Sequence, residues 1–263
     1  EIVFPAAILQ PPFFDLKADD ALNYGGIGAV IGHEMTHGYD DQGARFGPSG
    51  NLEDWWTPAD KKNLEGLTGK LVKQFDQYKV DGQAVNGHLT LGENIADLGG
   101  LATAYDALQK ATAGKEDPKV DGFTQDQRFF MNWATVWRTK YTAENAKVRL
   151  ATDPHAPAQF RAMGAPSNLP TFAAAFQCKA GSPVARTGAQ QVVLWYAAAA
   201  PKADPRRPMN PRASVSGAPG HPRLARPYWS CRPARPRPAP GIPPLACGPT
   251  PPNIPTCRPP ARV

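Results

Sequence analysis

The sequence predicts a mainly α-helical domain with a few short N-terminal strands, followed by a disordered tail. Three observations support this fold class. Apolar residues recur at helical spacing in several stretches before residue 195. An extended IVF segment near the N-terminus precedes closely spaced prolines. After residue 195 no helical or strand period is sustained, because prolines interrupt every window.

Charge and proline are divided unevenly between the two parts. Residues 1–195 contain 18 Lys and Arg against 22 Asp and Glu, a net charge of −4. Residues 196–263 contain 11 against 1, a net charge of +10, together with 19 of the 30 prolines. Such a tail buries too little apolar surface to offset the entropy of ordering it. We therefore expect a folded domain over 1–195 that does not bind nucleic acid, and a Pro/Arg-rich disordered tail over 196–263.

The first helix is predicted over residues 21–40. Its glycines lower helix propensity, so packing or the close approach of another backbone must compensate. The apolar side chains predicted to face the core are Leu22, Ile27, Val30, Ile31 and Met35. The segment that follows is rich in turn residues and predicts a loop.

The remaining helices have clear start signals. Thr57 caps the second helix with Pro58 in its first position, and Thr124 with Gln127 forms a capping box. The stretch TDPHAPAQFRAMG predicts a loop. The predicted helices after the first begin at residue 58 and then span 89–111, 125–141, 143–150 and 170–176.

No run of apolar residues is long enough to cross a bilayer, so we expect no membrane contact from this segment. The first residues lack an initiator methionine and the features of a signal peptide. We expect the chain to be a fragment whose beginning lies elsewhere.

The motif HEMTH carries the chemistry. On a helix His33 and His37 lie one turn apart on one face, where both imidazoles can reach one metal ion. Glu34 is turned away from the pair by about 100°, so it can contact a water without binding the metal. Histidines on helices are more often surface or core residues, but this spacing favours a metal site.

A catalytic zinc site needs a third protein ligand, either a downstream His or a downstream Glu. His88 lies in a turn and is better explained as a solvated loop residue. Glu93 and Asp97 lie one turn apart on the third helix. Glu93 would bind the ion while Asp97 accepts the second N–H of a ligating histidine. An acidic pair at this spacing is otherwise usually a solvated face.

Three motifs in order resemble the catalytic end of the neprilysin family, which includes the endothelin-converting enzymes and bacterial oligopeptidases. They are HEMTHGYDDQGARFGPSGNLEDWW, LTLGENIADLGGLATAYDAL and TDPHAPAQFRAMGAPSNLPTFAAAFQC. The resemblance runs from residue 1 to about residue 195. It implies a zincin-like (thermolysin-like) catalytic fold, one Zn²⁺ held by His33, His37 and Glu93, and Glu34 as general base.

The same resemblance assigns four further residues. Asp97 would be one of the catalytic residues and would hold a zinc-binding histidine in place, and Asp40 would have a similar supporting role. His155 would stabilise the oxyanion and Arg161 would hold a substrate carbonyl. Without the resemblance, His155 is better explained as a loop histidine and Arg161 as a surface arginine.

The implied function is zinc-dependent endopeptidase cleavage of short peptides, in an extracytoplasmic enzyme that is periplasmic, secreted or membrane-anchored. The resemblance also implies a substrate-binding strand before residue 1 and an N-terminal lid domain that the activity requires. A catalytically incomplete zinc-binding fragment is the main alternative. A zinc aminopeptidase, and a tail that binds nucleic acid or a proline-recognising module, are less favoured alternatives.

Overall fold

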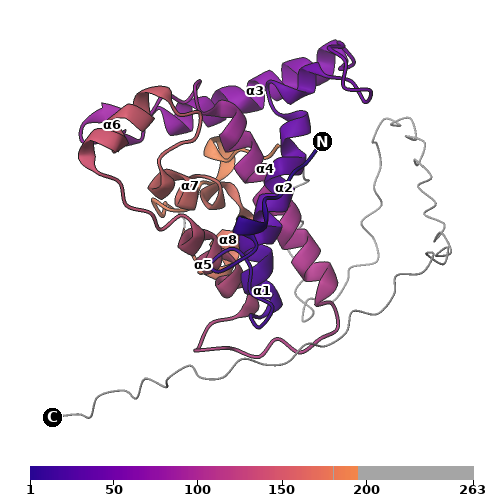
Figure 1. The fold of residues 1–263 in the computed structure, drawn as a ribbon, viewed down its shortest axis with the longest axis vertical. Coiled ribbons are helices and arrows are strands. Elements are labelled where there is room, and N and C mark those ends of the chain that lie inside the picture. Colours follow the sequence, from indigo (N-terminus) through magenta and orange to yellow (C-terminus); the bar gives the residue numbers. More distant parts are fainter. Residues whose placement is uncertain (180, 195–263) are drawn as a thin grey trace, which may run out of the picture. The chain divides into compact units, whose positions relative to one another are not determined.

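The structure is a computed structural model that describes residues 1–179 and 181–194. Its described part is mainly helical (Figure 1), which confirms the predicted fold class. The predicted boundary at residue 195 and the tail 196–263 lie outside the described residues. The helices are α1 (Asp20–Asn23), α2 (Ala29–Thr36), α3 (Pro58–Phe75), α4 (Leu91–Ala111), α5 (Gln125–Val136), α6 (Ala143–Thr152), α7 (Ala158–Gly164) and α8 (Pro170–Ala175).

Strands form at a different place from the one predicted. Residues 1–5 form no strand, and a short 3-10 turn, Ala6–Ile8, follows them. In the described residues the only sheet pairs β1 (Lys79–Val80) with β2 (Gln83–Ala84) in antiparallel register. The connecting residues Asp81 and Gly82 both have positive φ, at 48° and 83°. That conformation gives a tight hairpin turn, whereas the N-terminal segment pairs with no strand among the described residues.

Residues 20–39 form one helical path with a π-turn between α1 and α2 at Tyr24–Gly28. Helix α2 lies along α4 (Figure 1). A Cβ at Gly32 would lie 2.6 Å from the carbonyl oxygen of Gly100, and a Cβ at Gly100 would lie 2.3 Å from the backbone nitrogen of His33. The two backbones therefore touch, as the glycines of this helix predict, and the contact holds His33 against α4.

The apolar side predicted for the first helix was wrong for two residues. Ile31 is 41% exposed and Met35 is 54% exposed. Helix α2 instead buries Ala29, Gly32, His33 and Thr36. Small residues let α4 approach this face closely, so the side that carries the bulky apolar residues is turned away from it.

The later helices follow their start signals. The side chain of Thr57 accepts a hydrogen bond from the backbone N–H of Asp60 at the start of α3, and the Thr124–Gln127 capping box begins α5. Helices α3, α4 and α5 supply most of the core. The largest fully buried side chains of these helices are Trp133, Phe129, Leu71, Ile95, Leu98, Leu101 and Leu108.

Two later elements differ from the prediction. Helix α5 ends at Val136 rather than residue 141, and the ring of Trp137 lies against the Arg161 guanidinium at 3.8 Å. Helix α7 forms within the stretch predicted as a loop. Its seven residues are too few to show a helical period, and the carbonyl of Pro157 begins it by accepting from the N–H groups of Phe160 and Arg161.

Candidate metal centre

Two histidines from α2 and its 3-10 extension meet a glutamate from the first turn of α4. The Nε2 atoms of His33 and His37 lie 3.0 Å apart. Oε2 of Glu93 lies 3.1 Å from the first and 3.6 Å from the second. One ligand atom from each of the three residues falls within 4.8 Å of the others, a grouping that could hold a metal ion. His88 is exposed and does not belong to this group.

Each imidazole is held at its other nitrogen by an aspartate. Nδ1 of His33 lies 2.8 Å from Oδ1 of Asp97, and Nδ1 of His37 lies 2.7 Å from Oδ2 of Asp40. The other oxygen of Asp40 accepts from the backbone N–H groups of Gln42 and Gly43. A proton held on each Nδ1 would leave Nε2 as the atom of each ring that binds a metal ion.

The electrostatics of the site favour a cation at this point. Burial by itself lowers the pKa of His33, but the carboxylates of Asp97 and Glu93 outweigh it and raise this pKa to about 9. Burial raises the pKa of Glu93, but His155 and His33 outweigh it and hold this pKa well below its usual range. A strongly acidic carboxyl beside basic imidazoles is a donor set suited to a divalent metal.

One buried atom supports the same conclusion. Oε2 of Glu93 is buried without a hydrogen bond of acceptable geometry, although imidazole nitrogens lie within 3.6 Å of it. A buried carboxylate oxygen without a well-formed hydrogen bond is costly, and a metal ion among these nitrogens would satisfy it. The residues present therefore fit a zinc ion with a His, His, Glu ligand set.

Asp97 also binds a buried arginine. Nε of Arg161 donates to Oδ2 of Asp97 at 2.8 Å, and a terminal nitrogen donates to Oδ1 at 2.6 Å. Arg161 is 7% exposed and lies over the ring of Trp137. The sequence does not predict this ion pair, since 64 residues separate the partners and no local pattern joins them. The predicted role of Arg161 toward a substrate carbonyl stays a prediction.

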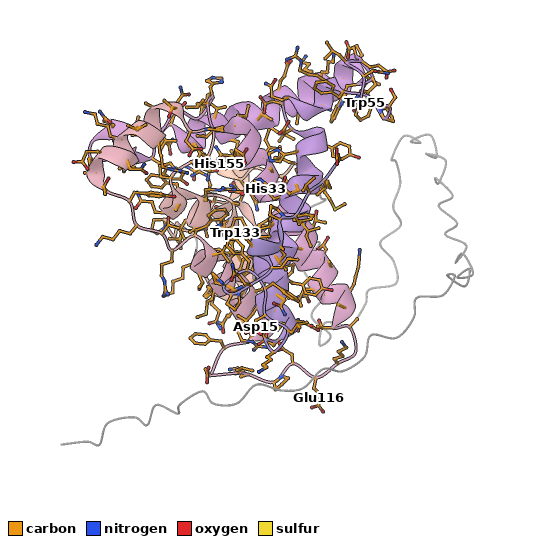
Figure 2. The ribbon with its side chains drawn as sticks, in the orientation of Figure 1. Asp15, His33, Trp55, Glu116, Trp133 and His155 are labelled. Carbon is orange, nitrogen blue, oxygen red and sulfur yellow. The ribbon has the colours of Figure 1, made fainter. Side chains whose placement is uncertain are left out.

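His155 lies between α6 and α7 and reaches the same group of residues (Figure 2). Its Nε2 is 3.1 Å from Oε2 of Glu93. Asp153 was not singled out from the sequence, yet its Oδ1 accepts from the backbone N–H of His155 at 2.9 Å and lies 2.8 Å from Nδ1 of the ring. The Asp-x-His spacing could have indicated this contact, because Asp side chains commonly bond the backbone two residues on.

A cavity of about 180 Å³ lies beside this group of residues and is lined in part by His33, Asp97 and His155. Glu34 is partly buried and borders it. The predicted general base and the predicted oxyanion donor thus face the same space. A larger cavity of about 630 Å³, between the loop after Asp40 and α3, contains none of these groups. The ionisable residues that line the smaller cavity are His33, Glu34, Asp97, His155 and Arg161.

A mainly helical domain in which two packed helices bring two histidines and a glutamate together has the zincin-like class of fold. The sequence pattern of peptidase family M13 matches residues 1–192. The chain belongs to peptidase family M13. In the described part of the chain, no helix combines the length and the hydropathy needed to cross a membrane.

Relatives of known sequence agree with this assignment. Endothelin-converting enzyme 1 of Bos taurus is 46% identical over 187 residues, which are 70% of this chain and 25% of the relative. Neprilysin-3 of Drosophila melanogaster is 44% identical over 191 residues, 69% of this chain and 24% of the relative. The chain spans about a quarter of the length of these relatives.

Solved structures show the same fold. The inhibitor complex of the Mycobacterium tuberculosis zinc metalloprotease Zmp1 has a TM-score of 0.71 and 46% identity, covering 73% of this chain and 30% of that one. PepO of Lactobacillus rhamnosis has a TM-score of 0.66 and 40% identity, covering 73% and 29%.

Proposed function

We propose that this protein is a zinc-dependent endopeptidase that hydrolyses short peptides, with zinc held by His33, His37 and Glu93. The observation that carries the proposal is the convergence of three ligand atoms within 4.8 Å beside a cavity that Glu34 borders. Membership of a peptidase family gives the reaction class. A zinc ion held there would polarise the scissile carbonyl and lower the pKa of a bound water to near neutrality.

In this proposal Glu34 moves the proton. Its carboxylate lies one residue beyond His33 on α2 and is turned away from the ligand pair, so it is free to accept a proton from the attacking water. The same carboxyl then gives the proton to the leaving amine. Because Glu34 borders the cavity with His155 and Arg161, the proton acceptor and the polar groups that face the peptide share one space.

His155 and Arg161 would act on the substrate carbonyls. A donor on Nε2 of His155 would stabilise the negative charge that grows on the scissile oxygen. Asp97 would contribute by holding His33 through Nδ1 and by fixing the Arg161 guanidinium. Asp40 would hold His37 in the same way. Arg161 retains donors beyond the two that Asp97 engages, and these would hold a peptide carbonyl.

The proposal is tested by replacing Glu34 with Gln. The variant should bind zinc one to one while cleavage of a quenched-fluorescence peptide falls by about 10²–10⁴-fold. Glu65→Gln is the matched control, because Glu65 is an exposed glutamate on α3. Turnover retained in Glu34→Gln would remove Glu34 from the base role, and loss of zinc binding would make its role structural.

A second candidate is a zinc-binding domain that does not cleave peptides alone. The chain spans about a quarter of its relatives, and the lid domain implied by the family resemblance would supply the remaining substrate contacts. Peptide assays of this chain with and without a chelator separate the two candidates. Zinc bound without turnover at any peptide tested would favour the second.

An extracytoplasmic location is part of the same proposal. Its support is the relation to Membrane metallo-endopeptidase-like 1 of Mus musculus, which is 45% identical over 190 residues. Fractionation of cells that express the whole protein tests this location.

A further inference from the structure

Helix α6 ends in a chain of contacts that leads to His155. The guanidinium of Arg149 lies over the ring of Tyr141, 4.9 Å from its centroid. One of its terminal nitrogens lies 2.5 Å from Oδ2 of Asp153, the residue that caps the C-terminus of α6. The other oxygen of Asp153 is engaged by the backbone and the ring of His155.

Both carboxylate oxygens of Asp153 therefore have a partner: Oδ2 contacts Arg149, and Oδ1 contacts His155. A carboxylate held only by His155 could rotate about its side-chain bonds and carry the imidazole with it. Held also by Arg149, it presents Oδ1 to Nδ1 in one orientation. That orientation aims Nε2 of His155 at the site, 3.1 Å from Glu93.

We propose that Arg149 is a positioning residue that acts through Asp153 to fix the orientation of the His155 imidazole. Arg149 does not contact the metal-binding group, and it borders a small cavity of about 60 Å³ with His155 and Arg161. Its side chain is 44% exposed, so its ion pair adds little to the stability of the fold. Its effect is on the geometry of one histidine.

The kinetic test compares variants of the full chain loaded with zinc. Arg149→Ala should lower kcat by about two- to fivefold, the range expected for a partly exposed ion pair, with KM unchanged within about twofold. Arg149→Lys should restore most of kcat, because Lys keeps the charge that pairs with Asp153. Lys147→Ala removes an exposed cation two residues earlier on α6 and should leave kcat unchanged.

A double-variant cycle separates positioning from a general structural role. In an Asp153→Asn background, Arg149→Ala should have no further effect on kcat, because the link through the carboxylate is already broken. Equal losses of kcat in both backgrounds would overturn the proposal. So would an unchanged kcat in Arg149→Ala with an intact circular dichroism spectrum.

A second readout does not depend on turnover. In NMR spectra, exchange of the Nδ1 proton of His155 with water should be several-fold faster in Arg149→Ala than in the parent or in Lys147→Ala. Equal exchange rates would refute the positioning role. The kinetic arm rests on the proposed endopeptidase function, so absence of any turnover in the parent chain would count against that function while the exchange rates still decide the role of Arg149.

Discussion

Replacing Asp97 with Asn tests how far one buried carboxylate supports both the fold and the metal site. Asp97 is 2% exposed, accepts two hydrogen bonds from Arg161 and lies 2.8 Å from Nδ1 of His33. In the variant Arg161 stays charged and buried but loses its counter-ion. Breaking a buried ion pair from one side costs about 3–5 kcal/mol. That is a large share of the roughly 5–15 kcal/mol that stabilises a typical domain.

Urea unfolding of the zinc-free chain measures this loss directly. The free energy of unfolding should fall by about 3–5 kcal/mol, and the melting temperature by about 6–20 °C. Asp106→Asn on the same helix is the matched control, since Asp106 is exposed and its change should stay within about 0.5 kcal/mol. Zinc affinity should fall by about 10–100-fold in Asp97→Asn, because an amide in place of the carboxylate no longer offers His33 a negatively charged acceptor for its Nδ1 proton.

A companion variant tests whether the unpaired charge of Arg161 causes the loss of stability. Adding Arg161→Met to Asp97→Asn removes the uncompensated charge, so the double variant should be more stable than Asp97→Asn alone. Two results would contradict this explanation: a double variant no more stable than Asp97→Asn, or a loss below about 1 kcal/mol in Asp97→Asn. Either would show that Asp97 does not stabilise the fold by neutralising the buried Arg161.

Three further predictions concern the metal site. In urea titrations, Gly100→Ala should lower the free energy of unfolding by about 1–3 kcal/mol, because the added methyl group overpacks against His33. Gly69→Ala is the control, since Gly69 has open space around it, and it should not destabilise the chain. The raised pKa of His33 means that a proton must leave this ring when zinc binds. The zinc dissociation constant, measured by chelator competition, should therefore fall as pH rises from 6.5 to 9. A dissociation constant that does not change with pH would contradict this. Asp40→Asn should weaken zinc binding by about 10–100-fold in the same assay, because His37 loses its carboxylate acceptor, and unchanged affinity would remove Asp40 from that role.

Local signals in the sequence were enough to place most helices. The caps at Thr57 and Thr124 and the apolar spacing along 89–111 depend on residues within a few positions of one another. The first helix shows the limit of such signals. Its bulky residues Ile31 and Met35 predict the buried side, but the helix is buried through its small residues because another backbone comes within contact distance.

The shortest elements could not be predicted from the sequence for a different reason. Helix α7 has seven residues, too few for a period to show, and β1 and β2 have two residues each. Their formation depends on the turn at Asp81 and on the carbonyl of Pro157. Strands expected at the N-terminus did not form, because a strand needs a partner that local sequence does not supply.

The candidate ligands and their spacing on each helix can be predicted from the sequence, since HExxH and GENIAD each place their polar groups within one helical turn. The sequence also favoured Glu93 over His88 as the residue that meets the histidines. Only the tertiary structure decided that Arg161 is the counter-ion of Asp97 and that His155 lies beside Glu93. More than 60 residues separate the partners in each of these two contacts. Helix packing at the Gly32–Gly100 contact in turn brings α2 and α4 together. Periodicity determines which side of a helix a residue occupies, but not which other helix that side will meet.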